Sequence, residues 1–308
     1  MRTTQFGISL APNIADMSKL RELAHLADTL GLDLLGIQDH PYVSRFFDTM
    51  SLISVLLAET RRLRIFPNVA SLPLRPPALL AKSAASLDIL SDRRFELGIG
   101  SGASWEGIAA MGGQRRTPGE AIQVLEEGIA IMRAIWNGQG SLRFDGKYYS
   151  LRGLQPGPRP AHTMGIWVGA VGEKMLHLTG RLAGGWAAPI VSYLPYERWA
   201  WAQEAIDHGA RQAGRDPSSI LRVANLVGSI TNRRGGGQPR GSAPLEGTSA
   251  YWIEVLTSLA LATRFDAFIF WPEIPSSEQI ERFAREVAPG VREAVEKELG
   301  IHHFCIAL

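Results

Sequence analysis

An acid and an imidazole stand side by side where an apolar stretch of the chain ends. They are Asp39 and His40, and the apolar residues 32–37 precede them, as is typical of a strand buried on both faces. Alone, the pair fits a functional site and a polar strand end equally well. His40 could act as a general acid, as a hydrogen-bond donor to a heterocycle, or as a neutral residue fixed by Asp39.

Small residues follow two further apolar stretches. They form the loops Gly100-Ser101-Gly102 and Gly169-Ala170-Val171-Gly172. Glycine lets backbone N–H groups approach an anion closely, and a helix that begins near Glu173 would direct its N-terminal dipole at a phosphate. Neither loop is a full dinucleotide fingerprint, and glycine is also common where a strand simply turns into a helix. Two such loops on neighbouring strands favour a phosphorylated cofactor.

Other kinds of site find little support. No second His, Asp or Glu follows His40 at metal-ligand spacing, and His302 and His303 belong to a C-terminal tail, so we expect no metal site. No Gly-x-Ser-x-Gly elbow follows a strand, which argues against a serine hydrolase. The only cysteine, Cys305, allows neither an intrachain disulfide nor a cysteine cluster.

The composition is that of an ordinary soluble protein. The 308 residues are 45% hydrophobic and 20% charged, with a formal net charge of +2. Such a chain has no strong field to attract nucleic acid or a membrane surface. No uncharged apolar run approaches the ~18 residues of a membrane span, and no export signal is recognisable. We therefore expect a cytoplasmic protein whose partner is a small-molecule substrate.

The elements that would position the site alternate along the chain. Eight short apolar stretches predict strands near residues 5–10, 33–38, 63–70, 94–100, 164–170, 184–188, 220–228 and 266–271. A helix candidate follows each, and the segments 18–30 and 118–136 repeat apolar residues with a period near 3.6. This alternation implies parallel strands with right-handed crossovers. We expect a single α/β domain over 1–308, a (β/α)₈ TIM barrel with its site at the C-terminal strand ends.

Two irregular segments interrupt the alternation. Residues 138–163 contain Asp145-Gly146 between alternating residues, which predicts an inserted β-hairpin. Residues 232–247 are rich in glycine and cannot pack a core, which predicts a mobile loop after the seventh strand. The loop is either a lid or a slack, solvated segment. Its arginines 233, 234 and 240 would contact an anion if it were a lid.

Several segments together resemble the bacterial luciferase-like flavin and deazaflavin oxidoreductases. These segments are Asp39-His40, 72–82, 94–102, 167–170, 268–272 and 278–284. Their order along eight βα units carries the resemblance. It implies a (β/α)₈ barrel that binds FMN or coenzyme F420 at the C-terminal mouth, usually as a homodimer.

The Asp-His pair is similar to the branch of the family that uses coenzyme F420. The resemblance implies that these residues contact the deazaflavin ring, and that a non-proline cis peptide at Asn68-Val69 backs it. His40 is the candidate for proton transfer. The expected cofactor contacts are Asp39, His40, Asn68, Val69, Ala70, Gly100, Ser101, Gly102, Gly169, Ala170, Val171 and Gly172.

The side chains expected to line the substrate pocket are apolar and aromatic. We expect Tyr42, Trp105, Trp271 and residues of the loop after the seventh strand to line it, although an aromatic at a strand end such as Trp271 is as often plain packing. Where the sugar-phosphate dehydrogenases of this family carry a glutamate, this chain has Ala103. This difference argues against sugar-phosphate oxidation.

Three functions follow from these observations. The first is an F420-dependent oxidoreductase that moves hydride to or from a small organic substrate, since a deazaflavin transfers hydride and reacts poorly with oxygen. The second is an FMN-dependent monooxygenase that works with a separate flavin reductase. The third is a cofactor-binding barrel with little turnover. The alternative follows from Ala103, because the chain has no acidic side chain at that position.

Overall fold

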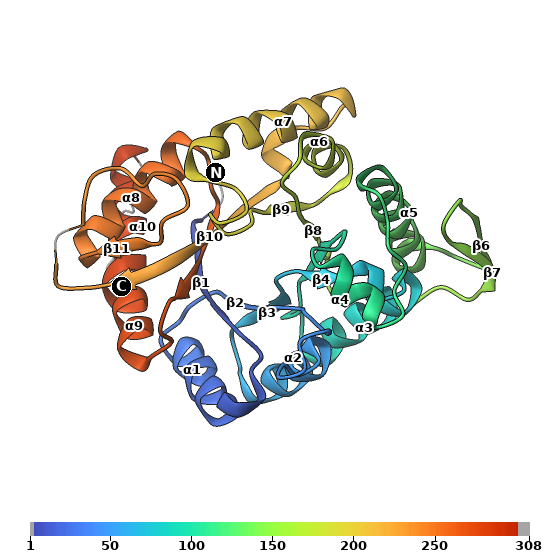
Figure 1. The fold of residues 1–308 in the computed structure, drawn as a ribbon, viewed down its shortest axis with the longest axis horizontal. Coiled ribbons are helices and arrows are strands. Elements are labelled where there is room, and N and C mark those ends of the chain that lie inside the picture. The colour runs from blue at the N-terminus through green and yellow to red at the C-terminus, as the bar shows by residue number, and fades with distance from the viewer. Residues whose placement is uncertain (1–2, 234, 301–308) are drawn as a thin grey trace, which may run out of the picture.

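Parallel strands form a nearly closed barrel with helices around it (Figure 1). The computed structural model describes residues 3–233 and 235–300, so Arg234, His302, His303 and Cys305 lie outside the described residues. The barrel strands are β1 (Gln5–Leu10), β2 (Leu34–Ile37), β3 (Arg64–Pro67), β4 (Ala70–Ser71), β5 (Leu97–Gly100), β8 (Ile166–Gly169), β9 (Gly185–Ala187), β10 (Leu221–Ile230) and β12 (Ala267–Pro272).

Helices cover the outside of this barrel. They are α1 (Met17–Thr29), α2 (Thr49–Glu59), α3 (Pro77–Leu90), α4 (Trp105–Ala110), α5 (Pro118–Asn137), α6 (Glu173–Leu182), α7 (Trp199–Gln212), α8 (Ser249–Ala262), α9 (Ser277–Arg282) and α10 (Ala288–Glu298). None of the helices within the described part of the chain combines the length and the apolar character that crossing a bilayer requires.

The strand order confirms the predicted barrel. It runs β3-β2-β1-β12-β10-β9-β8-β5-β4, with parallel pairing throughout. Strands β3 and β4 are two pieces of the predicted third strand, separated by Asn68 and Val69. A parallel bridge between Ile65 and Phe95 links the two edges of the sheet. The eight predicted strands are therefore all present, and the third is interrupted at the barrel mouth.

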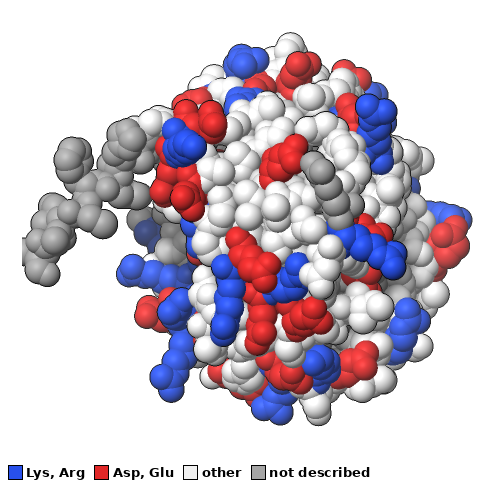
Figure 2. Space-filling model, turned by 90° about the vertical axis from the view of Figure 1, so that its left-hand side faces the viewer, with Lys and Arg blue, Asp and Glu red and all other residues white. Residues whose placement is uncertain are grey.

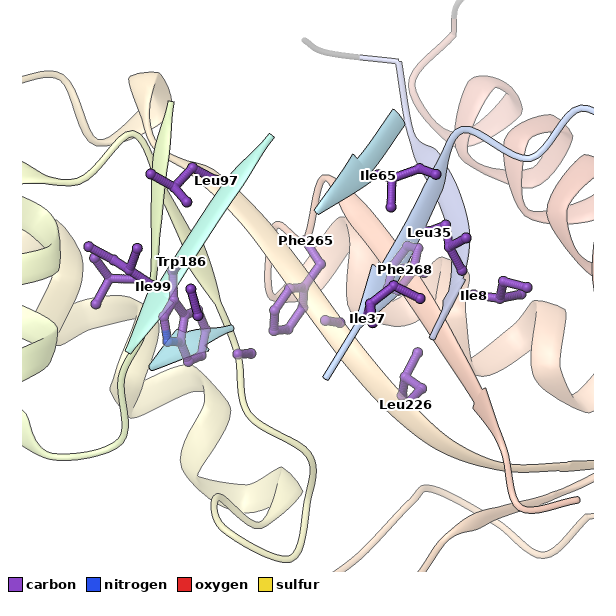
Figure 3. Packing of buried hydrophobic residues seen from close by; sticks show 14 of the residues in the cluster. Ile8, Leu35, Ile37, Ile65, Leu97, Ile99, Trp186, Leu226, Phe265 and Phe268 are labelled. Carbon is purple, nitrogen blue, oxygen red and sulfur yellow. The ribbon is translucent and has the colours of Figure 1, made fainter. Parts of the chain in front are cut away.

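The side chains of the strands form two apolar layers. One layer packs between barrel and helices, with Leu35, Ile37, Leu97 and Ile99 among its members (Figure 3). The other fills the barrel interior and consists of Leu34, Phe66, Trp167, Val223, Ala267 and Ile269. Because side chains alternate along a strand, the interior positions nearer the mouth fall on Gly36, Gly98, Gly100 and Gly169. Apolar side chains thus fill the barrel interior away from the mouth, and the glycines leave space at the mouth.

The predicted hairpin is present. Strands β6 (Leu142–Asp145) and β7 (Ser150–Leu154) pair antiparallel, and Figure 1 shows them standing out from the barrel beside α5. Glu127 of α5 accepts N–H hydrogen bonds from Lys147, Tyr148 and Tyr149 at 2.7–3.0 Å. The carboxylate thereby attaches the turn of the hairpin to the helix.

The loop predicted over 232–247 ends earlier than expected. Residues Leu245–Gly247 form β11, which pairs in parallel with β10 and buries Leu245 and Gly247. Gly241 donates its N–H to Glu197 and its carbonyl accepts from Tyr196, so the loop also touches the 3₁₀ turn Tyr196–Arg198 that precedes α7. The prediction of an unpacked segment is wrong for 245–247. The lid function of the remainder stays a prediction.

Charges of both signs are mixed on the surface that α8 and α10 present (Figure 2). This face carries no extended region of a single sign, which agrees with the small formal net charge of +2.

We expect Gly98→Ala to destabilise the barrel. A Cβ at this position would lie 2.4 Å from the Pro67 carbonyl oxygen and 3.0 Å from Cγ1 of Val69. Backbone cannot move aside as a flexible side chain can, so the free energy of unfolding in urea should fall by about 1–3 kcal/mol. Gly119→Ala in α5, where the added Cβ meets nothing within 4 Å, is the control and should lose nothing. Equal stability of the two variants would contradict this packing.

Candidate active site

A cavity of about 730 Å³ opens at the C-terminal ends of the strands. The predicted cofactor contacts and three of the predicted pocket residues line it: Asp39, His40, Tyr42, Asn68, Val69, Ala70, Gly100, Ser101, Gly102, Trp105, Gly169, Ala170, Val171, Gly172 and Trp271. These residues come from five separate strand ends, so the fold assembles the predicted set in one place. Their individual binding roles stay predictions.

The floor of the cavity is the segment between β3 and β4. Its Asn68–Val69 peptide bond is cis, which confirms the prediction for this bond. The Asn68 amide donates to Oδ1 of the buried Asn225 at 2.7 Å, and the Trp271 indole N–H donates to the same oxygen at 2.7 Å. Asn225 in turn donates to the carbonyl of Ala188 at 2.7 Å. One buried amide therefore connects three strand ends beneath the cavity.

Val69 lies over the glycines of two neighbouring strands. A Cβ at Gly100 or at Gly169 would come within 2.9 Å of Cγ2 of Val69. Both positions need glycine because the valine side chain fills the space above them. This packing explains Gly100 and Gly169 without the anion contact that the sequence suggested. It also gives the cavity an apolar floor.

Asp39 is buried in an ion pair with Arg75. The side chains are 1% and 16% exposed, and Arg75 donates from Nε and Nη2 to the two carboxylate oxygens at 2.8 and 2.7 Å. The Ser71 N–H donates to the same carboxylate at 2.8 Å, and Arg75 reaches Asp48 at 2.6 Å. Burial opposes the charge of Arg75, but its contacts with Asp39 and Asp48 raise its pKa overall. Asp39 thus fixes the end of β2 against β4.

His40 takes a different partner from the one considered in the sequence. Its Nδ1 lies 2.8 Å from the Tyr42 hydroxyl oxygen, whereas the Asp39 carboxylate bonds to Arg75 and Ser71. The interpretation of His40 as a residue fixed by Asp39 is therefore wrong. Burial lowers the pKa of His40 from 6.5, and the nearby Asp39 charge offsets only part of this effect. The imidazole is accordingly neutral near pH 7.

Helix α6 begins at the cavity. Its N-cap is Gly172, which has no side chain to accept the first N–H groups, and Glu173, Lys174 and Met175 of its first turn line the cavity. The free N–H groups of such a helix end bind anions well. An added Cβ at Gly172 would meet nothing within 4 Å. This end of the cavity can hold a phosphate.

Apolar and aromatic side chains form the walls. Trp105, Ile122, Ile190 and Tyr193 line the cavity together with Tyr42. Trp105 begins α4, so a short helix follows the fourth-strand loop directly. No described residue of 231–247 lines the cavity. The expected contribution from that loop is absent in the described part of the chain.

Some residues of the site escaped the sequence analysis. Arg75 lies in an apolar, proline-rich segment. A single charged residue in such a segment could have indicated that it pairs with a buried acidic side chain. Asn225 was similarly visible as an amide inside the apolar strand β10. Tyr193 belongs to an irregular segment and gave no signal. Within the described residues, no group of three or more His, Cys, Asp or Glu is arranged to hold a metal.

Comparison with known proteins gives one family match. The model of the luciferase-like monooxygenase family matches residues 2–234. A phthiodiolone/phenolphthiodiolone dimycocerosates ketoreductase of Mycobacterium kansasii is 37% identical over 176 residues, which cover 56% of this chain and 46% of that protein. The chain thus spans less than half of this relative.

Solved structures share the fold at low identity. An F420-dependent secondary alcohol dehydrogenase in complex with an F420–acetone adduct aligns with a TM-score of 0.80 at 16% identity, over 94% of this chain and 99% of that one. A riboflavin lyase with modified FMN and riboflavin aligns with a TM-score of 0.79 at 16% identity, over 98% and 93%. At 16% identity, these two alignments show that the chain shares the fold of both structures.

We expect Arg75→Met to be strongly destabilising. The variant leaves the Asp39 carboxylate buried without its cation, and removing one partner of a buried pair costs about 3–5 kcal/mol. Chemical denaturation would measure the loss. Arg115→Met is the control, because Arg115 and its partner Glu106 are 65% and 81% exposed, and such pairs contribute about 0–1 kcal/mol. A loss below about 1 kcal/mol for Arg75→Met would contradict the proposed role of the ion pair.

Proposed function

We propose that this chain, which belongs to the luciferase-like monooxygenase family, binds coenzyme F420 in its cavity and acts as an oxidoreductase. In this proposal, hydride passes between the deazaflavin and a small organic substrate. The observation that carries the proposal is that one cavity combines an apolar floor at Val69 with a helix N-terminus at Gly172–Met175 that no side chain caps.

The residues present fit such a cofactor. A tricyclic ring needs an apolar surface, which Val69 supplies, and a phosphate needs N–H donors, which the first turn of α6 supplies. His40 lines the cavity, and its Nε2 has no hydrogen-bond partner among the described residues. When bound, a deazaflavin supplies hydride chemistry. The protein would hold the ring over Val69, anchor the phosphate at α6 and present His40 to the reacting groups.

The comparisons support a redox function of this kind. One solved structure with the same fold is an F420-dependent alcohol dehydrogenase, and the curated relative is a ketoreductase by name. The riboflavin lyase structure contains modified FMN, and FMN also combines a tricyclic ring with a phosphate, so FMN is the alternative cofactor. An FMN-dependent monooxygenase would need a separate flavin reductase as its partner.

The expected homodimer remains a proposal. Apolar side chains of α2 and α3 stand exposed, among them Val55, Leu79, Ile89 and Leu90 at 41%, 64%, 46% and 83%. An interface between two copies would shield such apolar side chains from water. A second copy of the chain would bury it.

Gly172→Asp separates cofactor binding from folding. An aspartate at the N-cap suits the helix itself, but its carboxylate would compete with the phosphate for the same N–H groups. We expect the affinity for F420 to fall about tenfold or more, which corresponds to ~1.4 kcal/mol, while thermal stability is retained. Gly172→Ala should bind within about twofold of the unmodified protein, since the site has room for a methyl group. Quenching of tryptophan fluorescence during titration would measure both.

The same titration with FMN distinguishes the alternatives. Tight binding of F420 and weak binding of FMN would support the proposal. The reverse preference would favour a flavin-dependent monooxygenase. Unchanged F420 affinity in Gly172→Asp, or binding of neither cofactor, would contradict the site as described.

A further inference from the structure

Tyr42 connects His40 to the loop after β5. Its hydroxyl oxygen lies 2.8 Å from His40 Nδ1, and the ring centroids are 5.6 Å apart. The tyrosine ring packs on α4, where a Cβ at Gly107 would come within 2.5 Å of Tyr42 Cγ. Ser104, the N-cap of α4, binds the Gly107 N–H through its side chain. The start of α4 therefore fixes the position of the tyrosine.

The surroundings of the Tyr42 oxygen set the direction of this hydrogen bond. Burial raises the pKa of Tyr42, so its hydroxyl group keeps its proton near neutral pH. Among the described residues, the one acceptor within reach of this hydroxyl is His40 Nδ1 at 2.8 Å, so the O–H group donates to that nitrogen. A neutral imidazole that accepts at Nδ1 carries its proton at Nε2.

We propose that Tyr42 is a positioning residue that holds His40 in the Nε2–H tautomer, so that the cavity offers a hydrogen-bond donor to a carbonyl oxygen. The inference rests on the proposed function and narrows its substrate class. The cavity walls at Trp105, Ile122 and Tyr193 are apolar or aromatic. The substrate class is therefore an apolar ketone or aldehyde, and the favoured direction is reduction.

The proton movements balance in that direction. A bound reduced deazaflavin would supply hydride to the carbonyl carbon, and the oxygen, which receives the C=O π electrons, would take the Nε2 proton of His40. Tyr42 passes its hydroxyl proton to Nδ1, so the imidazole stays neutral. After the alcohol leaves, Nε2 takes a proton from water and Nδ1 returns its proton to the Tyr42 oxygen, which restores the Nε2–H tautomer. The raised pKa of Tyr42 favours this return at neutral pH.

The tautomer can be measured without any cofactor. The ¹⁵N shifts of the His40 ring in the ligand-free protein should show a protonated Nε2 and a bare Nδ1, and the spectrum of His40→Gln identifies the signals. Tyr42→Phe keeps the ring packed on Gly107 but removes the hydroxyl, so we expect a mixture of tautomers. Tyr148→Phe, on the hairpin outside the cavity, is the control and should leave the His40 signals unchanged.

Turnover gives the second readout. With reduced F420 and an apolar ketone, Tyr42→Phe should lower kcat at least tenfold and change KM little, whereas Tyr148→Phe should match the unmodified protein. A bare Nε2 in the unmodified protein, or a Tyr42→Phe variant with unchanged tautomer and unchanged kcat, would overturn the inference. Failure of F420 to bind the unmodified protein would remove the proposed function but leave the tautomer result standing.

Discussion

The structure depends on one steric constraint, the passage of Asn68 and Val69 across the barrel mouth. The two residues interrupt the third strand, and their side chains occupy space above the interior positions of neighbouring strands. Gly36 makes room for Asn68, while Gly98, Gly100 and Gly169 make room for Val69. A methyl group at any of these positions would meet the crossing segment. The glycines thus convert a filled barrel into one with a shallow floor and a cavity above it.

Polar groups near this floor are almost all satisfied by the protein. Asn225 binds Asn68, Trp271 and Ala188, and Asp39 is held by Arg75 and Ser71. Buried polar networks of this kind are rigid when every member has a partner. Among the described residues, the groups that remain for a ligand include an apolar surface, the Nε2 of His40, the unpartnered Oγ of Ser71 and the first turn of α6. This small set of free groups is what makes the cavity suited to a flat ring with an anionic tail.

Local sequence patterns predicted the elements well and the contacts between them poorly. Apolar stretches and helical periodicity predicted all eight strand positions, and the loops at 100–102 and 169–172 marked the correct end of the barrel. The Asp39–Arg75 and Asn68–Asn225 contacts join residues 36 and 157 positions apart, so they depend on which strand ends meet. The same limit explains why the glycines were interpreted as anion contacts. Their neighbour Val69 comes from another strand.

The most direct test of the account is a crystal structure of the protein with coenzyme F420. We predict the deazaflavin ring on Val69, His40 Nε2 at the ring or at the substrate side of it, and the phosphate at the N–H groups of Glu173, Lys174 and Met175. A cofactor bound elsewhere on the molecule would contradict the account. So would a ring in the cavity whose phosphate lies away from α6.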